Sequence, residues 1–198
     1  MWTRREYLKA IFAAGATAGL GLPLGRAGEQ DPDVILRITA KPDVVPIWKG
    51  EPTAVFRFAG EVMKGRQDAL RPSGSYLGPT LDLRRGERVR IEVVNRTGDP
   101  TVIHWHGMIV PDSADGHPHQ AVRSGDRYTI EFTVRNPAGT YLYHPHPHRI
   151  TGRQTYYGLA GLLIVREPAE RDMGLPGLEQ ELELVLQDRR IREDNQFV

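Results

Sequence analysis

Short runs in which apolar and polar residues alternate, separated by turn residues, cover most of the chain from residue 34 onward. The clearest run, residues 88–94 (RVRIEVV), is typical of a strand with one wet and one buried face. Runs of this kind at this spacing predict an all-β Greek-key β-sandwich of roughly 140 residues. Strands are expected at residues 34–38, 53–58, 81–83, 88–94, 101–106, 127–134, 139–144 and 158–165.

The chain continues beyond the predicted sandwich, which we assign to residues 28–166. Residues 167–179 are polar and interrupted by proline and glycine, so they are expected to form a linker. Residues 181–186 (ELELVL) alternate again and predict one more strand. Because a strand with an apolar face needs a sheet to join, we expect residues 180–198 to be the first strand of a truncated second domain.

The first 27 residues have the layout of an export signal. Arg4, Arg5 and Lys9 precede an apolar stretch of small residues from Ala10 to Leu24, and cleavage is expected near Ala27. This stretch is shorter than the roughly 20 apolar residues that cross a bilayer, and its glycines disfavour the alternative, an anchoring helix. The adjacent arginines resemble a twin-arginine signal. We therefore expect export to the periplasm or the cell exterior, with no membrane span in the mature protein.

Composition narrows the classes of function. The chain of 198 residues has 26 basic and 25 acidic side chains, and the first 27 residues hold four and one of them, which leaves 22 and 24. A mildly acidic body without a basic stripe does not favour a nucleic-acid partner. The sequence has no cysteine, which excludes disulfides, thiolate-bound metals and a cysteine nucleophile within it.

The seven histidines are the most unusual feature of the composition. Each lies two residues from another, so that they form four pairs, whereas random placement gives about 0.2 such pairs in a chain of this length. The pattern therefore indicates a shared role. The residues are His104, His106, His117, His119, His144, His146 and His148.

The spacing of the histidines has a structural meaning on a strand. Residues i and i+2 point to the same face about 6.6 Å apart, so His104 and His106 would direct both imidazoles to one face and Trp105 to the other. A second group lies at residues 143–148 (YHPHPH), where the prolines suit a sheet edge or loop. Together the two groups offer four neutral nitrogen donors, which suit copper, zinc or nickel.

The remaining histidines have simpler explanations. A single pair of histidines two residues apart, without a second pair, is more often on the surface or structural than metal-binding. His117 and His119 lie in a loop rich in Asp, Gly and Pro and are expected to face solvent. His148, the third histidine of its run, either supports the metal ligands or is merely exposed.

The two histidine motifs and their surroundings resemble those of the multicopper oxidases. Residues 104–107 (HWHG) and 143–146 (YHPH) follow the family's order, and residues 78–80 (GPT) and 158–165 (GLAGLLIV) agree with it. The resemblance covers roughly residues 50–188 and is closest to the bacterial laccase-like and cuprous-oxidase branch. It implies a cupredoxin fold, copper as the cofactor, and an oxidase that passes electrons to dioxygen.

The resemblance also implies roles for individual residues. Asp115, in the turn after the first motif, matches an acidic residue that relays protons to bound dioxygen, and an ordinary turn aspartate is the alternative. Trp105 is implied to be a packing residue. The implied copper ligands are His104 for the type 2 ion and His106, His144 and His146 for the type 3 pair.

The sequence departs from the family in what it lacks. The family's trinuclear cluster takes four further histidines from a carboxy-terminal domain, which also carries a type 1 site with its cysteine, and this sequence contains neither. We expect an amino-terminal portion of an oxidase that is inactive alone. Its partners would be the missing carboxy-terminal cupredoxin domains in cis or in trans, dioxygen, and a small reducing substrate such as a phenol or Cu(I). A stand-alone exported copper-buffering protein and a non-catalytic scaffold are the alternatives.

Overall fold

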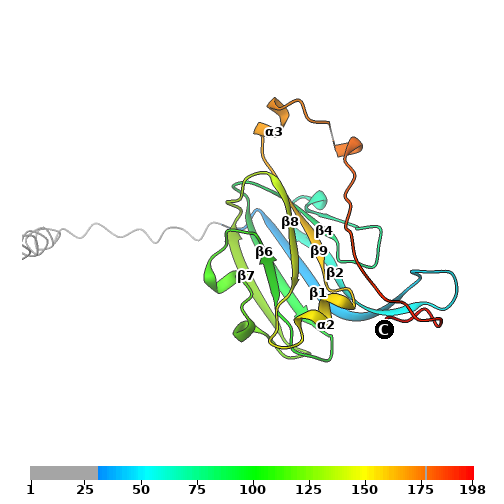
Figure 1. The fold of residues 1–198 in the computed structure, drawn as a ribbon. Helices are drawn as coiled ribbons and strands as arrows, with labels where there is room; N and C mark the ends of the chain where they lie inside the picture. The colour runs from blue at the N-terminus through cyan, green and yellow to red at the C-terminus, as the bar shows by residue number, and fades with distance from the viewer. Residues whose placement is uncertain (1–30, 177) are drawn as a thin grey trace, which may run out of the picture. The chain divides into compact units, whose positions relative to one another are not determined.

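The computed structural model describes residues 31–176 and 178–198, in which nine strands form two facing sheets (Figure 1). The predicted export signal, residues 1–27, lies outside the described residues. No helix in the described part is long and apolar enough to cross a membrane. The strands are β1 (Val34–Val45), β2 (Thr53–Lys64), β3 (Leu70–Arg71), β4 (Thr80–Arg84), β5 (Arg88–Asn95), β6 (Ile103–His106), β7 (Arg127–Thr133), β8 (Gly139–Pro145) and β9 (Gly161–Arg166).

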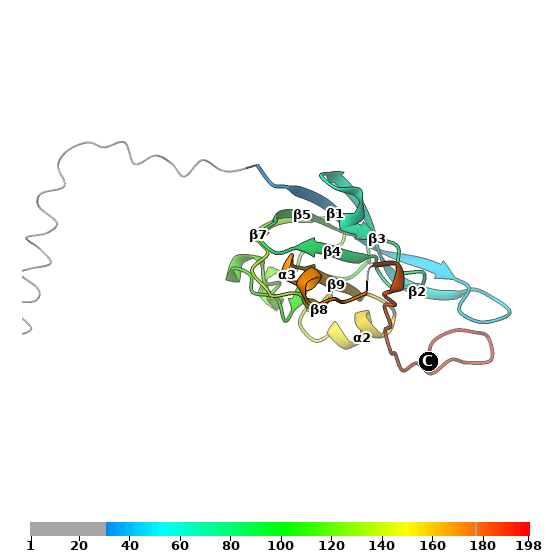
Figure 2. The same cartoon turned by 90° about the horizontal axis from the view of Figure 1, so that it is seen from above.

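The two sheets have the strand orders β2-β1-β5-β7 and β3-β4-β9-β8-β6. β1 runs parallel to β5 and β4 parallel to β9, while the other neighbours are antiparallel. Several strands that follow one another in the chain, such as β5 and β6, lie in different sheets, so the chain crosses repeatedly between the layers (Figure 2). The predicted all-β Greek-key sandwich is confirmed.

The core lies between the sheets and is built from the alternating positions of the strands. Val89, Ile91 and Val93 of β5 have no exposed surface, whereas the residues between them are partly exposed. Leu81 and Leu83 of β4 belong to the same buried cluster. Full burial of a side chain of this size stabilises a fold by roughly 1.5–3 kcal/mol, so this layer is the main source of cohesion between the sheets.

Strand boundaries differ from the predicted ones where backbone partners decide them. β1 and β2 extend well past the predicted residues because they pair along the whole hairpin. β6 begins at Ile103 because Thr101 forms an isolated bridge to Val122 in place of a ladder. β9 begins only at Gly161, since the residues before it, including Gly158 at φ +122°, form a turn.

The helical elements are short and lie in the connections between strands. In the described residues, α2 and α3 are α-helical and the others are 3₁₀ turns. α3 falls inside the segment predicted as a linker, residues 167–179, and η4 spans the end of that segment. The elements are η1 (Gln67–Ala69), η2 (Asp112–Ala114), η3 (Pro118–Gln120), α2 (Thr151–Tyr156), α3 (Ala169–Asp172) and η4 (Leu178–Gln180).

Residues 181–186, predicted as the first strand of a second domain, form no strand in this structure and belong to neither sheet. The segment runs alongside the sandwich (Figure 1), where Glu181 forms an ion pair with Arg166 at 2.7 Å and Glu183 forms one with Arg71. The leucines that alternate with these glutamates are exposed. Side-chain ion pairs therefore replace the backbone ladder that the alternation predicted. The assignment of this segment to a second domain stays a prediction.

The last residues of the chain also pack on the sandwich. Phe197 is 4% exposed, and its ring centroid lies 5.7 to 6.0 Å from those of Tyr76, Tyr156 and Tyr157. The hydroxyl of Thr53 on β2 donates to the backbone oxygen of Asn195 at 2.7 Å. The carboxy-terminal residues are thus held by burial and hydrogen bonds rather than by strand pairing.

Candidate metal centre

Strands β6 and β8 lie side by side at one edge of the five-stranded sheet (Figure 1). The antiparallel register places His104 directly opposite His144, and Trp105 opposite Tyr143. Cross-strand partners share a face of a sheet, so the two histidines lie together on the partly exposed face. Trp105 and Tyr143 have no exposed surface and pack in the core, as the alternation predicts for Trp105.

Two glycines make room for the aromatic layer beneath the histidines. A methyl group on Gly78 or on Gly161 would overlap the Tyr143 side chain. The hydroxyl of Tyr143 donates to the backbone oxygen of Pro79 at 2.7 Å. These contacts give a physical reason for the glycines in residues 78–80 and 158–165, and they hold β8 against β9 and β4.

His104 lies at the centre of the histidine group. Its ring centroid is 5.8 Å from that of His106, 5.5 Å from that of His144 and 5.3 Å from that of His146. Among the described residues, ring nitrogens of His104, His106 and His144 all lie within 4.8 Å of one another. The structure therefore brings three of the four predicted ligands into one ligand group and places His146 beside it.

The closest pair of ring nitrogens is Nδ1 of His106 and Nε2 of His144, which are 3.1 Å apart. An ion with metal–nitrogen bonds of about 2.0 Å holds neighbouring ligand nitrogens roughly 2.8 to 3.3 Å apart. The same two nitrogens therefore fit a single metal ion, and the donor set of imidazoles suits copper.

Hydrogen bonds fix which nitrogen of each ring is free. The Nδ1–H of His104 donates to the backbone oxygen of Asp115 at 2.8 Å, and the Nδ1–H of His144 donates to that of Pro145 at 2.9 Å. Both rings therefore keep the Nε2 lone pair for a ligand, which is how metal-binding histidines are commonly oriented. Nδ1 of His146 is buried and has no hydrogen-bond partner among the described residues.

The environment also keeps His144 in the form that binds metals. Burial is the main cause that lowers the pKa of His144. The hydrogen bond to Pro145 opposes it, and each of the neighbouring His104, His106 and His146 lowers the pKa by a smaller amount. Because only the neutral imidazole binds a metal, this lowering of the pKa favours ligation at neutral pH.

Asp115 reaches the cluster through a turn that only glycine permits. Gly116 has φ +78°, and a methyl group there would overlap the backbone oxygen of Ile103. This close approach brings Oδ1 of Asp115 to 3.4 Å from Nδ1 of His104. The predicted proton-relay residue is therefore next to a predicted ligand.

The other predicted histidines lie outside the cluster. His117 is half-buried, and its Nε2 is 2.9 Å from Oδ1 of Asp112 and 3.6 Å from Oδ2 of Asp115. His119 is exposed and stacks on His117 with ring centroids 5.6 Å apart. His148 is exposed. His117 is thus partly exposed, as expected for a histidine outside the ligand group, and the two carboxylates in addition hold its ring.

Two residues that the sequence did not single out also hold the histidine strand. Tyr128 on β7 accepts the backbone N–H of Ile103 at 2.7 Å, and burial raises the pKa of its hydroxyl. Asn136 is buried, donates to the backbone oxygen of Gly107 at 2.9 Å and accepts from the N–H of Ile109 at 2.7 Å. Asn136 looked like an ordinary turn residue in the sequence, and only its burial identifies its role.

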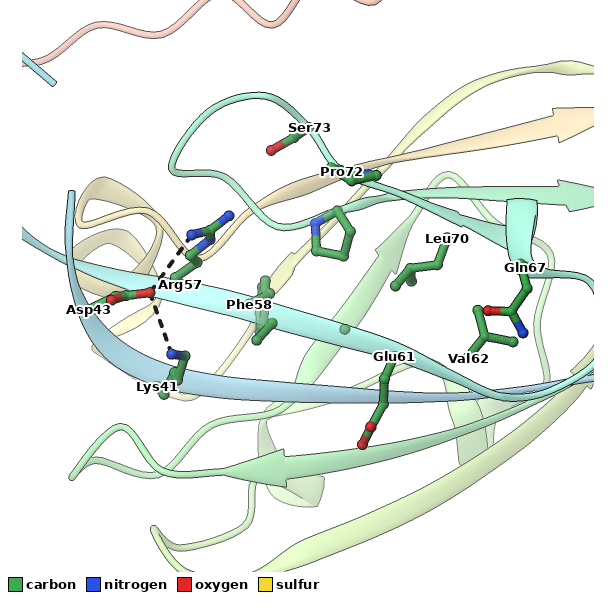
Figure 3. A pocket seen from close by; sticks show the side chains of 13 residues that line it. Lys41, Asp43, Arg57, Phe58, Glu61, Val62, Gln67, Leu70, Pro72 and Ser73 are labelled. Carbon is green, nitrogen blue, oxygen red and sulfur yellow. Dashed lines mark ion pairs between the residues drawn. The ribbon is translucent and has the colours of Figure 1, made fainter. Parts of the chain in front are cut away.

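A groove of about 610 Å³ lies away from the histidines, between β2 and the loop around β3 (Figure 3). Phe58, Leu70 and the charged residues at one end line it, and there Asp43 pairs with Lys41 at 3.5 Å and with Arg57 at 3.8 Å. No predicted site residue lines this groove. We therefore do not assign the groove to the candidate metal centre, despite its volume.

The fold and the histidine group together define a β-sandwich with a candidate metal site at one edge, and comparisons with known proteins identify its family. A family model described as multicopper oxidase matches residues 60–170. The multicopper oxidase mco of Staphylococcus aureus is 37% identical over 130 residues, which are 65% of this chain and 29% of that protein. The cell division protein FtsP of Edwardsiella tarda is 28% identical over 195 residues, which are 96% of this chain and 40% of that protein.

Solved structures agree with these matches. The crystal structure of McoA multicopper oxidase from the hyperthermophile Aquifex aeolicus superimposes with a TM-score of 0.70 and 33% sequence identity, covering 85% of this chain and 35% of that one. The chain therefore belongs to the multicopper oxidase family, which supports copper as the metal. It spans only 29 to 40% of the length of these three relatives.

Proposed function

We propose that this chain provides one half of the copper centre of an oxidase that couples one-electron oxidation of a substrate to reduction of dioxygen to water. The 3.1 Å separation between Nδ1 of His106 and Nε2 of His144 carries the proposal, because it fits two ligands of one ion. In this assignment His104 binds the type 2 ion, and the type 3 pair is bound by His106, His144 and His146.

The proposal of a half-centre rests on what the cluster offers. Four histidines are too few to hold three copper ions, and His106 is exposed, which leaves room for ligands from another polypeptide segment. The sequence has no cysteine for a type 1 site. Carboxy-terminal cupredoxin domains, in cis or in trans, would supply the remaining ligands and the entry point for electrons. We therefore propose that this chain alone is inactive.

Copper would supply one-electron redox chemistry and a binding site for dioxygen. The residues of this chain hold and orient the ligands: Asp115 and Pro145 accept the Nδ1–H groups of His104 and His144 and so direct the Nε2 atoms outward. The carboxylate of Asp115 lies 3.4 Å from the His104 ring, close enough to hold a proton beside the centre. A proton relay is the role that we propose for it.

The segment of residues 180–198 supports the presence of a further domain. Its glutamates are tied to the sandwich, while Leu182, Leu184 and Leu186 are 78%, 73% and 96% exposed. An exposed apolar row on an unpaired segment is the kind of surface that a sheet covers. We propose that these residues become the first strand of that domain. Separately, we propose that residues 1–27 are an export signal of the twin-arginine type.

The alternative function is that of a stand-alone exported protein that buffers copper. The observation in its favour is that three histidine nitrogens already converge without any partner. A buffer would bind copper tightly as this chain alone, whereas a half-centre would bind it weakly until the complementary domains arrive. Only the oxidase needs a reducing substrate, which we propose to be a phenol or a metal ion such as Cu(I).

The test is a copper titration of the full chain, followed by electron paramagnetic resonance, alone and with the remaining part of the Staphylococcus aureus relative. We expect weak binding alone. After mixing, the coupled type 3 pair should lose its paramagnetic resonance intensity, and oxygen should be consumed once a phenol is added as the electron donor. His144→Ala should weaken binding roughly 10- to 100-fold, while His119→Ala, at an exposed histidine outside the cluster, should leave it unchanged. Tight copper binding by a monomer, without oxygen uptake after mixing, would favour the copper-buffering protein. Absence of copper binding would favour the non-catalytic scaffold.

A further inference from the structure

The backbone holds the second histidine segment only weakly. The ladder between β6 and β8 ends at the pair of Ile103 and Pro145. Beyond it, the N–H of His146 donates to the backbone oxygen of Val102 at 2.9 Å, but proline at positions 145 and 147 has no N–H to donate. The position of His146 therefore depends on other contacts.

Gln154 supplies such contacts from α2, the helix that follows the histidine segment. Its side chain has no exposed surface. Its Nε2 donates to the backbone oxygen of Pro100 at 2.9 Å, and its Oε1 accepts from the hydroxyl of Thr101 at 2.8 Å. Pro100 and Thr101 lie directly before β6, so one buried amide joins the helix to the start of the first histidine strand.

The histidine segment is in turn tied to the same helix. The hydroxyl of Thr151 donates to the backbone oxygen of Pro147 at 2.7 Å, and the N–H of Gln154 donates to that of Ile150 at 3.0 Å. A buried amide that lost its partners would be costly to keep. These hydrogen bonds join the histidine segment, through α2 and the side chain of Gln154, to the residues directly before β6.

We propose that Gln154 is a positioning residue that sets the place of His146 beside His104, where the ring centroids are 5.3 Å apart. The inference rests on the proposed function only in so far as His146 is a copper ligand. Gln154 touches neither ring. It acts by holding the two histidine-bearing segments at a fixed separation where the ladder has ended.

The first measurement is hydrogen exchange of the full chain without metal. In Gln154→Leu, which removes both hydrogen bonds, the amide of His146 should exchange at least about 10-fold faster than in the wild type. Thr101→Val, which removes one of the two bonds, should accelerate it less. The amide of Ile38 in the other sheet should not change by more than the loss of global stability requires.

Copper affinity is the second measurement, and Thr53→Val is the matched control. It removes a buried hydroxyl hydrogen bond of 2.7 Å on β2 and leaves the histidine segments untouched. Gln154→Leu should lower the affinity roughly 10- to 100-fold, and Thr53→Val should not change it. Unaltered exchange at His146 in a folded Gln154→Leu would overturn the inference. Wild-type protein that binds no copper would overturn the proposed function instead, while the exchange data still decide the role of Gln154.

Discussion

At the scale of single residues, Gly116 is a position beside the candidate metal centre where any side chain would disrupt the backbone. Its φ is +78°, and a methyl group would overlap the backbone oxygen of Ile103, which cannot rotate away. We expect Gly116→Ala to lower the free energy of unfolding by about 2 to 4 kcal/mol, measured by urea denaturation. Gly125→Ala is the control, since Gly125 has φ +98° with no atom within 4 Å of the new methyl group.

The control separates backbone strain from overlap. Gly125→Ala adds only the cost of a left-handed backbone, about 1 kcal/mol, so the difference between the two variants measures the close approach of the Asp115 turn to β6. Equal losses in both variants would show that the turn can move aside. The contact between Asp115 and His104 would then not depend on glycine at this position.

At the scale of elements, the carboxy-terminal tail offers a test of how it is held. Phe197 is 4% exposed among three tyrosines, whereas Val198 beside it is 54% exposed. We expect Phe197→Ala to lower the free energy of unfolding by about 3 kcal/mol and to make residues 187–198 sensitive to protease. Val198→Ala should have little effect. A protease-resistant tail in Phe197→Ala would mean that the hydrogen bonds of Asn195 and Gln196 to the sandwich hold it without the ring.

The elements also show how far the sequence predicts this fold. β5 was predicted to within one residue because its alternation matches a ladder on both sides. The same alternation at residues 181–186 meets no backbone partner in this structure, since the period of the side chains does not reveal whether such a partner exists. The histidine motifs were placed on one face correctly. Gln154 and Asn136 were missed because their roles follow from burial, which a polar residue in a turn-rich segment does not disclose.

At the scale of the whole molecule, copper binding and folding are linked. The ligand group joins β6 to β8, which are 38 residues apart at His106 and His144, so only the folded chain offers both nitrogens together. A ligand that binds the folded state alone stabilises it by about 2.7 kcal/mol at 100 times its dissociation constant. For a domain of this size that corresponds to a rise in melting temperature of roughly 5 to 10 °C.

The prediction is therefore a copper-dependent melting temperature that depends on His106. Circular dichroism of the full chain should show the rise at saturating Cu(II), and His106→Ala, at an exposed ring that costs little stability by itself, should abolish most of it. His148→Ala is the matched control. It also replaces an exposed histidine by alanine, but among the described residues the His148 ring makes no ring contact with the cluster. An equal rise in all three proteins would place the copper elsewhere, because a centre built on the His106–His144 pair cannot survive the loss of one of its two nearest ligands.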